Sequence, residues 1–319
     1  MKKSIGIKFK LKDSNQLEQI KSIAPDYELI VSSNDDSKFS DCEVIFGNPA
    51  PEVLLGAKNL KWLHTNTAGV NTYTTSPDFS FPNHLMLTNS SGAYGLGISE
   101  YLLTLTLALL KNLNGYMGNQ STKTWQSLGK LKTLHGSKVT VVGMGDIGAN
   151  YAQKVQLLGG IVTGVTRTSK NPQDHPYASS LLTFADLDTV ISEADIVALS
   201  LPETPETIHL FDETRMSRMK KGSLLLNVGR GSAICETALI QHLASGHLGG
   251  AGLDVTEIEP LPTDSPLWHQ KNVILTPHIS GGNSLDITLD FIFDLFIKNL
   301  RAYVNGQPFE RTVNIHAGY

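Results

Sequence analysis

The sequence predicts an α/β protein with two doubly wound parallel-sheet domains, and three observations lead to this prediction. The chain has 319 residues, which corresponds to about two domains at roughly 150 residues each. Short runs of apolar, often β-branched residues alternate with longer segments of helical periodicity, as in parallel α/β sheets. A glycine-rich turn of the form G-x-G-x-x-G stands between one such run and the helical segment that follows it.

The strand-like runs fall into two groups. The first third of the chain contains five expected strands, Ile5–Phe9, Glu28–Val31, Glu43–Phe46, Trp62–Asn66 and Met86–Thr88, with short helices over Ser14–Ile23 and Pro51–Ala57. The centre contains six, Val139–Val142, Ile161–Val165, Asp195–Ser200, Ser223–Val228, Ala251–Asp254 and Val273–Thr276. Helices are expected between these, over Ile147–Leu158, Phe184–Ser192, Asp212–Met219 and Glu236–Ser245. Several of the six runs are apolar throughout, which is typical of strands covered by helices on both faces.

Two longer helical patterns, Ile98–Leu113 and Ser284–Val304, flank the central group. Their apolar residues recur at helical spacing, which by itself indicates core packing. Their placement also suggests that they are the two passages between the domains. We therefore expect one domain to combine residues 1–100 with 284–319, and the other to span 101–283, beginning with an interdomain helix.

Composition excludes several classes of protein. Net charge is −4, from 26 basic and 30 acidic residues, so a concentrated basic face for nucleic acid is not expected. Only two cysteines are present, which argues against a disulfide scaffold and for a reducing compartment, and they form no metal-ligand spacing. Lys8, Lys10 and Lys12 interrupt any apolar stretch near the N-terminus, and Ile98–Leu110 is shorter than the ~20 residues of a membrane span. We expect a cytoplasmic protein with no membrane partner and no metal.

The glycine-rich turn is expected to bind a dinucleotide. It comprises Gly143, Gly145 and Gly148, with Asp146 and Ile147 between them. The first glycine permits the tight turn, the second lets the backbone approach a pyrophosphate, and the third allows close helix–strand packing. The helix that follows presents unpaired N–H groups to the phosphates. An acid so near two phosphates is unusual, and Asp146 is expected to point to solvent.

The tip of the next strand is expected to select the cofactor. An Asp or Glu that would bind the ribose 2′-OH of NAD is missing from residues 164–170. Arg167 and Lys170 offer positive charge there instead, with hydroxyls from Thr166 and Thr168. This combination suits a 2′-phosphate, so NADP(H) is the expected cofactor and NAD(H) a possible one. The alternative is that Arg167 is an ordinary solvated loop residue.

Polar residues follow three further strand runs. Arg230 lies just past one, Asp254 ends another and is followed by Glu259, and His278 ends the last. Open α/β sheets bind ligands at the carboxyl ends of their strands. Each residue alone has an ordinary structural explanation, but three such strand ends beside a dinucleotide turn favour a catalytic site.

These segments resemble the D-isomer-specific 2-hydroxyacid dehydrogenase family, in particular its NADPH-dependent glyoxylate/hydroxypyruvate reductase-like branch. The matching segments run in order from about residue 60 to 285: Asn66–Val70, Ser91–Glu100, Gly143–Gly148, Leu201–Thr207, Asn227–Gly231, Gly252–Val255, Glu259–Leu261, Pro266–Trp268 and Thr276–His278. Thr256 departs from the pattern, because the family usually has an aromatic or large residue there. The resemblance implies a Rossmann cofactor domain inserted into a flavodoxin-like substrate-binding domain.

The resemblance also implies the roles of individual residues. Arg230 would hold the substrate carboxylate and polarise the 2-oxo group, His278 would be the general acid, and Glu259 would orient and stabilise its imidazole. Cofactor contacts would further come from Pro202, Thr207, Val228 and Asp254, and substrate contacts from the backbone of Ala68, Gly69 and Val70. Tyr94 and Trp268 are pocket candidates, with core or interface packing an equal alternative.

The expected activity is reversible reduction of a small 2-keto acid to the D-2-hydroxy acid by NADPH, in a homodimer. Two alternatives stay open at this point. One is an NAD-dependent short-form phosphoglycerate dehydrogenase-like enzyme. The other is a non-catalytic, nucleotide-sensing interaction protein on the same fold.

Overall fold

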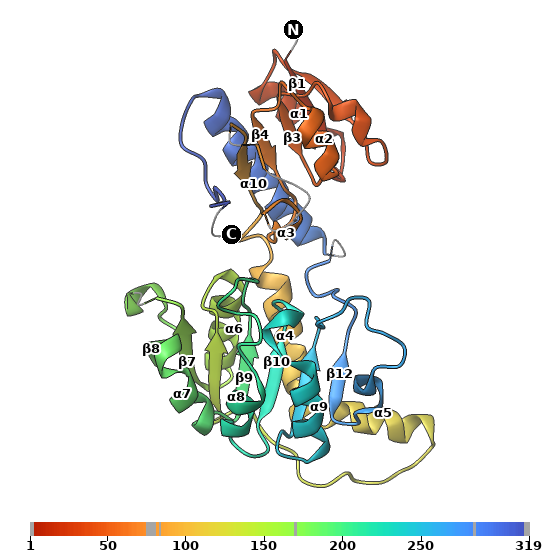
Figure 1. The fold of residues 1–319 in the computed structure, drawn as a ribbon, viewed down its shortest axis with the longest axis vertical. Coiled ribbons are helices and arrows are strands. Elements are labelled where there is room, and N and C mark those ends of the chain that lie inside the picture. Colours follow the sequence, from red (N-terminus) through yellow and green to blue (C-terminus); the bar gives the residue numbers. More distant parts are fainter. Residues whose placement is uncertain (1–2, 75–80, 83, 169–170, 283–284, 316–319) are drawn as a thin grey trace. The chain divides into compact units, whose positions relative to one another are not determined.

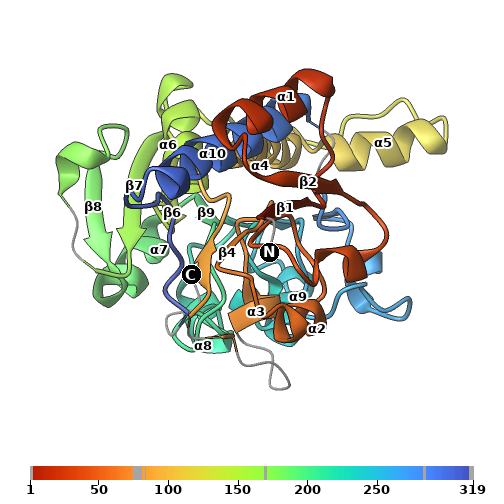
Figure 2. The same cartoon turned by 90° about the horizontal axis from the view of Figure 1, so that it is seen from above.

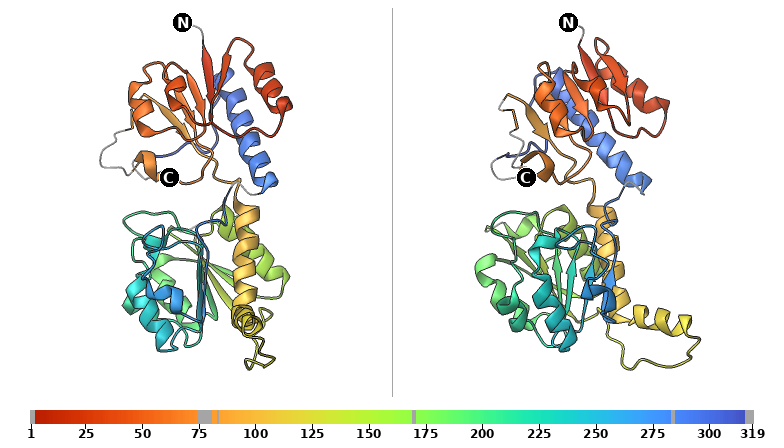
Figure 3. Two further views of the ribbon diagram at one scale, coloured as in Figure 1. Left: turned by 90° about the vertical axis from the view of Figure 1, so that its right-hand side faces the viewer. Right: turned by 45° about the vertical axis from the view of Figure 1, so that its right-hand side comes forward.

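The chain divides into two compact units, residues 1–94 with 283–319 and residues 95–282. The computed structural model describes residues 3–74, 81–82, 84–168, 171–282 and 285–315, and Figures 1 and 3 show the ribbon. Unit 1 contains β1 (Ser4–Ile7), α1 (Ser14–Ile23), β2 (Glu28–Val31), the 3-10 turn η1 (Asp36–Phe39), β3 (Val44–Phe46), α2 (Pro51–Gly56), β4 (Trp62–His64), α3 (Asn71–Thr74), β5 (Met86–Thr88) and α10 (Asp286–Val304).

Unit 2 is the larger of the two. It contains α4 (Gly95–Leu110), α5 (Leu113–Ser121), β6 (Lys138–Val142), α6 (Asp146–Leu157), β7 (Ile161–Thr166), η2 (Pro172–Asp174), β8 (Ser180–Thr183), η3 (Phe184–Asp186), α7 (Leu187–Glu193), β9 (Ile196–Leu199), α8 (Glu213–Arg218), β10 (Leu224–Asn227), η4 (Gly231–Ala233), α9 (Glu236–Ala244), β11 (Gly250–Leu253), η5 (Pro266–His269) and β12 (Val273–Leu275).

The sheet of unit 1 has five parallel strands in the order β2-β1-β3-β4-β5, the flavodoxin-like order. Successive side chains of a strand point to opposite faces. Phe46 and Trp62 lie on the face that packs on Phe296 of α10, with ring centroids 4.0 and 5.5 Å away. Their neighbours Ile45 and Leu63 join the apolar cluster of the other face. Helices α1 and α10 are in contact (Figure 2).

The sheet of unit 2 has seven parallel strands in the order β12-β11-β10-β9-β6-β7-β8. From β6 the chain adds strands in one direction (β7, β8), and from β9 it adds them in the other (β10, β11, β12). The strand order therefore reverses between β6 and β9, and sheets of this kind bind ligands at the carboxyl ends of the two strands at that point. Helices α4 and α6 cover one face, and α7, α8 and α9 cover the other (Figure 3). Strands β9 and β10 are buried at every residue, which explains why their sequences are apolar except for Asn227 at the end of β10.

The predicted fold class, two parallel-sheet α/β domains, is confirmed. One strand, β8, is missing from the sequence prediction, because it is a partly exposed edge strand without an apolar run. The helix predicted over Ile98–Leu113 ends at Leu110 instead. Asn112 then adopts a left-handed backbone with φ of 52°, which Asn tolerates better than most residues, and α5 starts at an angle of 67° to α4.

Within the described part of the chain, no single helix is long and apolar enough to cross a membrane. Helices α4 and α5 reach that length only as a bent pair. The expectation that Ile98–Leu110 is a core helix is confirmed, because Leu102 and Leu105 are buried and α4 packs on α6, β10 and β11.

Candidate active site in unit 2

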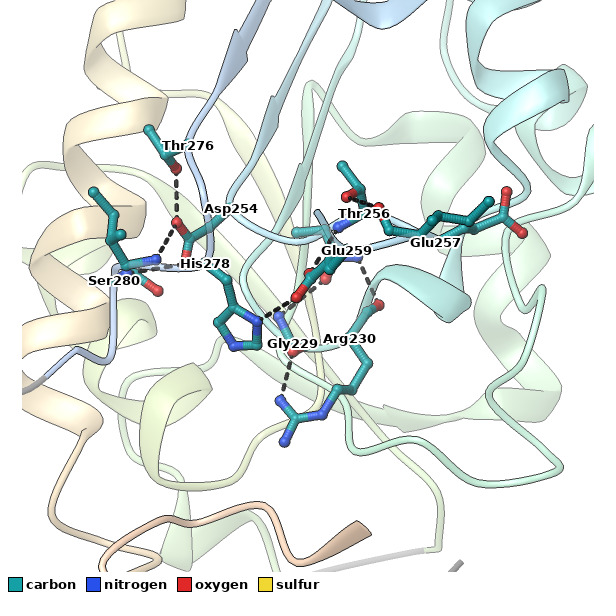
Figure 4. A network of polar contacts seen from close by, with 12 residues as sticks. Gly229, Arg230, Asp254, Thr256, Glu257, Glu259, Thr276, His278 and Ser280 are labelled. Carbon is teal, nitrogen blue, oxygen red and sulfur yellow. Dashed lines mark hydrogen bonds and ion pairs between the residues drawn. The ribbon is translucent and has the colours of Figure 1, made fainter. Parts of the chain in front are cut away.

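The carboxyl ends of β10, β11 and β12 bring the three predicted catalytic residues into one cluster (Figure 4). These strands are neighbours in the sheet, so the segments that follow them emerge side by side. Arg230 follows β10, Glu259 lies in the segment after β11, and His278 follows β12. The adjacency that the sequence analysis assumed for these strand ends is therefore present in the fold.

Glu259 and His278 form an ion pair. Nδ1 of His278 lies 2.7 Å from Oε2 of Glu259, while the other oxygen, Oε1, accepts the backbone N–H of Thr256 at 3.1 Å. The carboxylate therefore bridges its own turn and the imidazole. Nε2 of His278 has no hydrogen-bond partner among the described residues, and the side chain is half exposed. This nitrogen is left available to exchange a proton with a bound molecule.

Arg230 presents its guanidinium on the same side of the cluster as the imidazole of His278 (Figure 4). Its Nη1 donates to the carbonyl of Gly229 at 2.8 Å, and its own carbonyl accepts from Nδ2 of Asn227 at 2.9 Å. The remaining donors of this permanent cation suit a planar anion such as a carboxylate.

Asp254 is 1 % exposed, and its carboxylate is fully engaged by the turn that carries His278. Oδ1 accepts from Oγ1 of Thr276 at 2.7 Å and from the N–H of Ile279 at 3.0 Å, and Oδ2 accepts from the N–H of Ser280 at 2.9 Å. His278 itself has a left-handed backbone with φ of 50°, a conformation that costs energy in a non-glycine residue. Asp254 therefore anchors the strained turn that carries His278.

The glycine-rich turn follows β6 and opens α6. Gly143 has φ of 98°, and a Cβ there would lie 2.6 Å from the carbonyl oxygen of Ser200. A Cβ at Gly148 would lie 1.9 Å from the carbonyl oxygen of Gly143. Both glycines are thus required by the packing of the turn itself. A Cβ at Gly145, in contrast, would meet nothing within 4 Å, so this position is open, and the N-terminus of α6 has no side-chain cap.

The expectation that Asp146 points to solvent is wrong. Its Oδ2 accepts the backbone N–H of Gly95 at 2.6 Å, and its Oδ1 accepts from Nδ2 of Asn150 at 3.2 Å. The carboxylate therefore caps the start of α4, where the free N–H groups of a helix favour an anion. Ile147, next in the turn, is partly buried at the start of α6.

The segment after β7 carries the residues expected to contact a 2′-phosphate. Arg167 is half exposed, and its Nη1 lies 3.9 Å from Oε2 of Glu206. Oγ1 of Thr166 bonds within the protein, to the carbonyl of Thr168 at 2.8 Å, so Thr166 shapes the segment. Thr168 is exposed, and Lys170 lies outside the described residues.

The remaining predicted cofactor residues shape loops around the sheet. Oγ1 of Thr207 lies 2.8 Å from the carbonyl of Pro202 and 2.8 Å from the N–H of Thr204, which closes the loop after β9. Val228 is buried, and its N–H donates to the carbonyl of Leu199 at 3.1 Å.

The sequence analysis missed one residue that supports the glycine-rich turn. Oγ of Ser200 donates to the carbonyl of Gly143 at 2.8 Å, and its position at the end of β9, a polar residue after an apolar run, was a usable signal.

The predicted substrate residues Ala68, Gly69 and Val70 belong to unit 1, in the loop between β4 and α3. The carbonyl of Ala68 accepts from Nδ2 of Asn89 at 2.8 Å, and that of Gly69 accepts from Oγ1 of Thr67 at 2.8 Å. These two carbonyls thus bond within the unit. The backbone N–H groups of Gly69 and Val70, in contrast, have no hydrogen-bond partner among the described residues.

The two aromatic candidates have different surroundings. Tyr94 is buried, its hydroxyl donates to the carbonyl of Asn66, and burial raises the pKa of this phenol. It therefore supports the loop that leads to Gly69. Trp268 is half exposed and donates to the carbonyl of Pro262 at 2.9 Å.

Thr256, the departure from the family pattern, closes its own turn by donating from Oγ1 to the carbonyl of Ile258 at 2.9 Å. Among the described residues, no group of His, Cys, Asp or Glu side chains could hold a metal ion.

Comparisons with known proteins agree with this geometry. Residues 103–280 match the family described as D-isomer specific 2-hydroxyacid dehydrogenase, NAD binding domain. The chain belongs to this family. It is 28% identical over 311 residues to glyoxylate/hydroxypyruvate reductase B of Enterobacter sp. (strain 638), covering 96% of this chain and 94% of that protein. It is 32% identical over 223 residues to the protein of the same name in Serratia proteamaculans (strain 568), covering 68% of this chain and 67% of the relative.

Solved structures of the dehydrogenase family also superpose on the whole chain. A D-isomer specific 2-hydroxyacid dehydrogenase family protein from Aeromonas salmonicida has a TM-score of 0.85 and 29% identity, covering 99% of this chain and 100% of that one. A dehydrogenase from Xanthobacter autotrophicus Py2, solved in complex with NADPH and MES, has a TM-score of 0.82 and 25% identity, with both chains covered completely. The family resemblance stated from the sequence is confirmed, and this 2-hydroxyacid dehydrogenase is an oxidoreductase.

Proposed function

We propose that this dehydrogenase transfers hydride from NADPH to C2 of a small 2-keto acid and yields the D-2-hydroxy acid, reversibly. The observation that carries the proposal is the Glu259–His278 pair at 2.7 Å, with Arg230 on the same side of the cluster. The reductase names of the relatives from Enterobacter and Serratia support the substrate class. The related structure with NADPH, and one from Rhizobium etli with NADP at 26% identity, support the cofactor.

The glycine-rich turn fits a dinucleotide. Gly145 leaves open space above the uncapped N-terminus of α6, whereas Gly143 and Gly148 pack against the turn itself. Backbone N–H groups at this helix end would hold the pyrophosphate. Because Asp146 is turned toward Gly95, its charge is directed at the start of α4. When bound, NADPH supplies the hydride that the reaction needs.

The three side chains provide the remaining chemistry. Arg230 binds the carboxylate of the keto acid and stabilises the negative charge that grows on the carbonyl oxygen. His278 donates a proton from Nε2 to that oxygen, so that the carbonyl becomes a hydroxyl, and it accepts the proton in the reverse direction. Glu259 fixes the ring through Nδ1 and stabilises the imidazolium. The neutral imidazole left after reduction regains its proton from solvent.

We assign substrate binding to unit 1 through the backbone of residues 68–70. The N–H groups of Gly69 and Val70 suit a small anion, because consecutive backbone N–H groups form anion-binding concavities. The loop follows the carboxyl end of β4, and parallel α/β sheets bind ligands at the carboxyl ends of their strands.

We propose that NADP(H) is preferred and that NAD(H) is a weaker cofactor. The end of β7 carries Arg167 and no acid. An acid there would accept the 2′-OH of NAD, and an Arg suits a 2′-phosphate. An NAD-dependent phosphoglycerate dehydrogenase-like enzyme is the second candidate function, and a clear NADH preference would favour it.

A single assay panel tests the proposal. Oxidation of NADPH and NADH is followed by absorbance with glyoxylate, hydroxypyruvate and larger 2-keto acids. Sustained turnover of at least one small 2-keto acid, with higher kcat/KM for NADPH, is the expected result. Nucleotide binding without turnover of any of them would contradict a reductase and indicate a nucleotide-sensing protein.

We further propose a homodimer that forms through unit 2. Helix α5 and the segment after it project from the body of this unit (Figures 1 and 3). They expose large apolar side chains, namely Leu113, Met117, Trp125, Leu128 and Leu131. Exposed apolar surface of this kind is typical of an interaction site. Sedimentation at micromolar concentration is expected to give a dimer for the native chain and a monomer for Trp125→Asp, and a native monomer would contradict the proposal.

We propose that the protein works in the cytoplasm on a small-molecule substrate, without a membrane or nucleic-acid partner. Both cysteines are free and Cys42 is buried, which suits a reducing compartment. The net charge of −4 disfavours binding to nucleic acid. Cell fractionation with an antibody against the chain would test the location.

A further inference from the structure

Two glutamates outside the catalytic cluster join the segments that carry Arg230 and Glu259. The backbone N–H of Glu236 donates to Oε2 of Glu257 at 2.9 Å, and the backbone N–H of Glu257 donates to Oε1 of Glu236 at 2.5 Å. Glu236 opens α9, a few residues after Arg230, and Glu257 lies two residues before Glu259. We call this reciprocal arrangement of Glu236 and Glu257 the glutamate clamp.

The clamp lies beside a close approach of the two backbones. A Cβ at Gly231 would lie 1.9 Å from the carbonyl oxygen of Thr256 and 2.7 Å from the nitrogen of Glu257. The residue after Arg230 therefore touches the turn that positions Glu259, with no room for a side chain. A shift of either segment moves the other, so the hydrogen bonds that align them affect both catalytic side chains.

A third segment completes the clamp. Nε2 of His209 is hydrogen-bonded to Oε1 of Glu257, and the N–H of His209 donates to the carbonyl of Ser232 at 2.7 Å. Both oxygens of Glu257 are therefore engaged, one by His209 and the other by the N–H of Glu236. Burial raises the pKa of Glu236, and the charge of Glu257 adds to this effect. The two carboxylates stay close here because each accepts a backbone N–H: Glu257 accepts that of Glu236 at the start of α9, and Glu236 accepts that of Glu257.

We propose that the glutamate clamp positions the acid–base pair: it holds turn 256–259 against the Arg230 segment, so that Glu259 reaches Nδ1 of His278. The link is direct, because Glu259 accepts from the N–H of Thr256 through one oxygen and pairs with His278 through the other. Glu236 and Glu257 are positioning residues, since neither is placed to touch the reacting atoms. The inference rests on the proposed function, because the pair it positions is the pair that the reductase uses.

The experiment compares Glu257→Ala and Glu257→Gln with the native chain. The control is Glu193→Ala, which removes an exposed glutamate of the same unit that pairs with Lys138. Glu257→Ala is expected to lower kcat by about 10- to 100-fold, because a misplacement of about 1 Å has that effect, while the Kd for NADPH and the KM for NADPH stay within about twofold. Glu257→Gln keeps one acceptor for the N–H of Glu236 and is expected to restore much of the loss.

A second measurement does not depend on turnover. The imidazole nitrogen NMR signals of His278 are assigned by their loss in His278→Gln. They are expected to move in Glu257→Ala and to stay in place in Glu193→Ala. If Glu257→Ala is poorly folded by thermal unfolding, His209→Ala removes one contact of the clamp and is expected to shift the same signals by less.

The outcomes separate the two proposals. If the native chain reduces no 2-keto acid, the proposed function is wrong, and the NMR comparison still tests the clamp. If the His278 signals and kcat are unchanged in a folded Glu257→Ala, the clamp does not position the pair, whatever the native activity is.

Discussion

The carboxylate of Asp254 accepts the backbone N–H of Ser280 at 2.9 Å, two residues beyond His278. With its other oxygen on Thr276 and Ile279, Asp254 spans the whole turn from the end of β12 past His278. A buried carboxylate with three donors is a strong anchor, because hydrogen bonds to charged groups are worth more than neutral ones. The left-handed backbone of His278 is stable because its neighbours on both sides are held in this way.

Replacing Asp254 by Asn is expected to damage both stability and catalysis. The amide presents an N–H₂ group to backbone N–H donors that need an acceptor, which costs about 1–3 kcal/mol. The turn is expected to loosen, and kcat to fall by about 10- to 100-fold. Thermal unfolding and steady-state kinetics measure the two effects. The exposed Asp264 provides the control Asp264→Asn, and equal behaviour of the two variants would show that Asp254 anchors nothing.

Replacing His278 by Ala is expected to lower kcat by about 10²- to 10⁴-fold, the usual contribution of a general acid. The Kd for NADPH is expected to stay unchanged, because the glycine-rich turn is remote from the ring in sequence and follows a different strand. Glu259→Gln is expected to act more mildly, since the amide still fills the place of the carboxylate beside Nδ1 of His278. His269→Ala, at an exposed histidine, is the control. Surviving turnover in His278→Ala would show that another group donates the proton.

Arg167 and Glu206 are expected to have opposite effects on cofactor choice. Arg167→Ala is expected to reduce kcat/KM for NADPH by about 10- to 100-fold, the worth of a charged hydrogen bond, with little change for NADH. Glu206 lies 3.9 Å from Arg167 and competes with a 2′-phosphate, so Glu206→Gln is expected to improve NADPH use by about twofold, as for an exposed pair. Arg301→Ala, at an exposed arginine of unit 1, is the control. If Arg167→Ala lowered kcat/KM equally with NADPH and NADH, Arg167 would have no role in cofactor selectivity.

His64 is expected to make the stability of unit 1 fall in acid. It is buried at the end of β4, with Nδ1 2.7 Å from Oγ1 of Thr88, and burial lowers its pKa from 6.5 to about 3. Between these values the unfolded chain binds the proton and the folded chain does not. The neutral, buried His64 therefore contributes its full share to the free energy of unfolding above pH 6.5. That share is lost as the pH falls toward 3.

The comparison is between the native chain and His64→Gln in urea unfolding at about pH 7 and about pH 5. As the pH is lowered, the free energy of unfolding of the native chain is expected to fall more steeply than that of His64→Gln. The difference in slope is up to about 1.4 kcal/mol per pH unit for one proton. The exposed His84 provides the control His84→Gln, which is expected to keep the native slope. Parallel slopes for the native chain and His64→Gln would mean that His64 is protonated in the folded state.

Most elements and most of the site could be predicted because their signals are local. Apolar runs such as residues 224–226 identify buried strands, and a polar residue directly after such a run marks a strand end. Strand β8 and the break at Asn112 were missed, because an edge strand needs no apolar run and a left-handed residue needs no glycine. Asp146 was misjudged, because its partner, Gly95, is distant in sequence and comes close only when α4 packs on α6.

By itself, the sequence determined the strands other than β8, the glycine-rich turn, and the candidate Arg230, Glu259 and His278, since spacing and residue type are properties of short segments. Only the tertiary structure decided that β10, β11 and β12 are neighbours, that Asp254 anchors the turn of His278, and that Glu236 and Glu257 join the segments that carry Arg230 and Glu259. The physical reason is that a hydrogen bond between distant segments depends on where packing places their backbones. Strand order and turn contacts provide that placement, and no single stretch of sequence contains it.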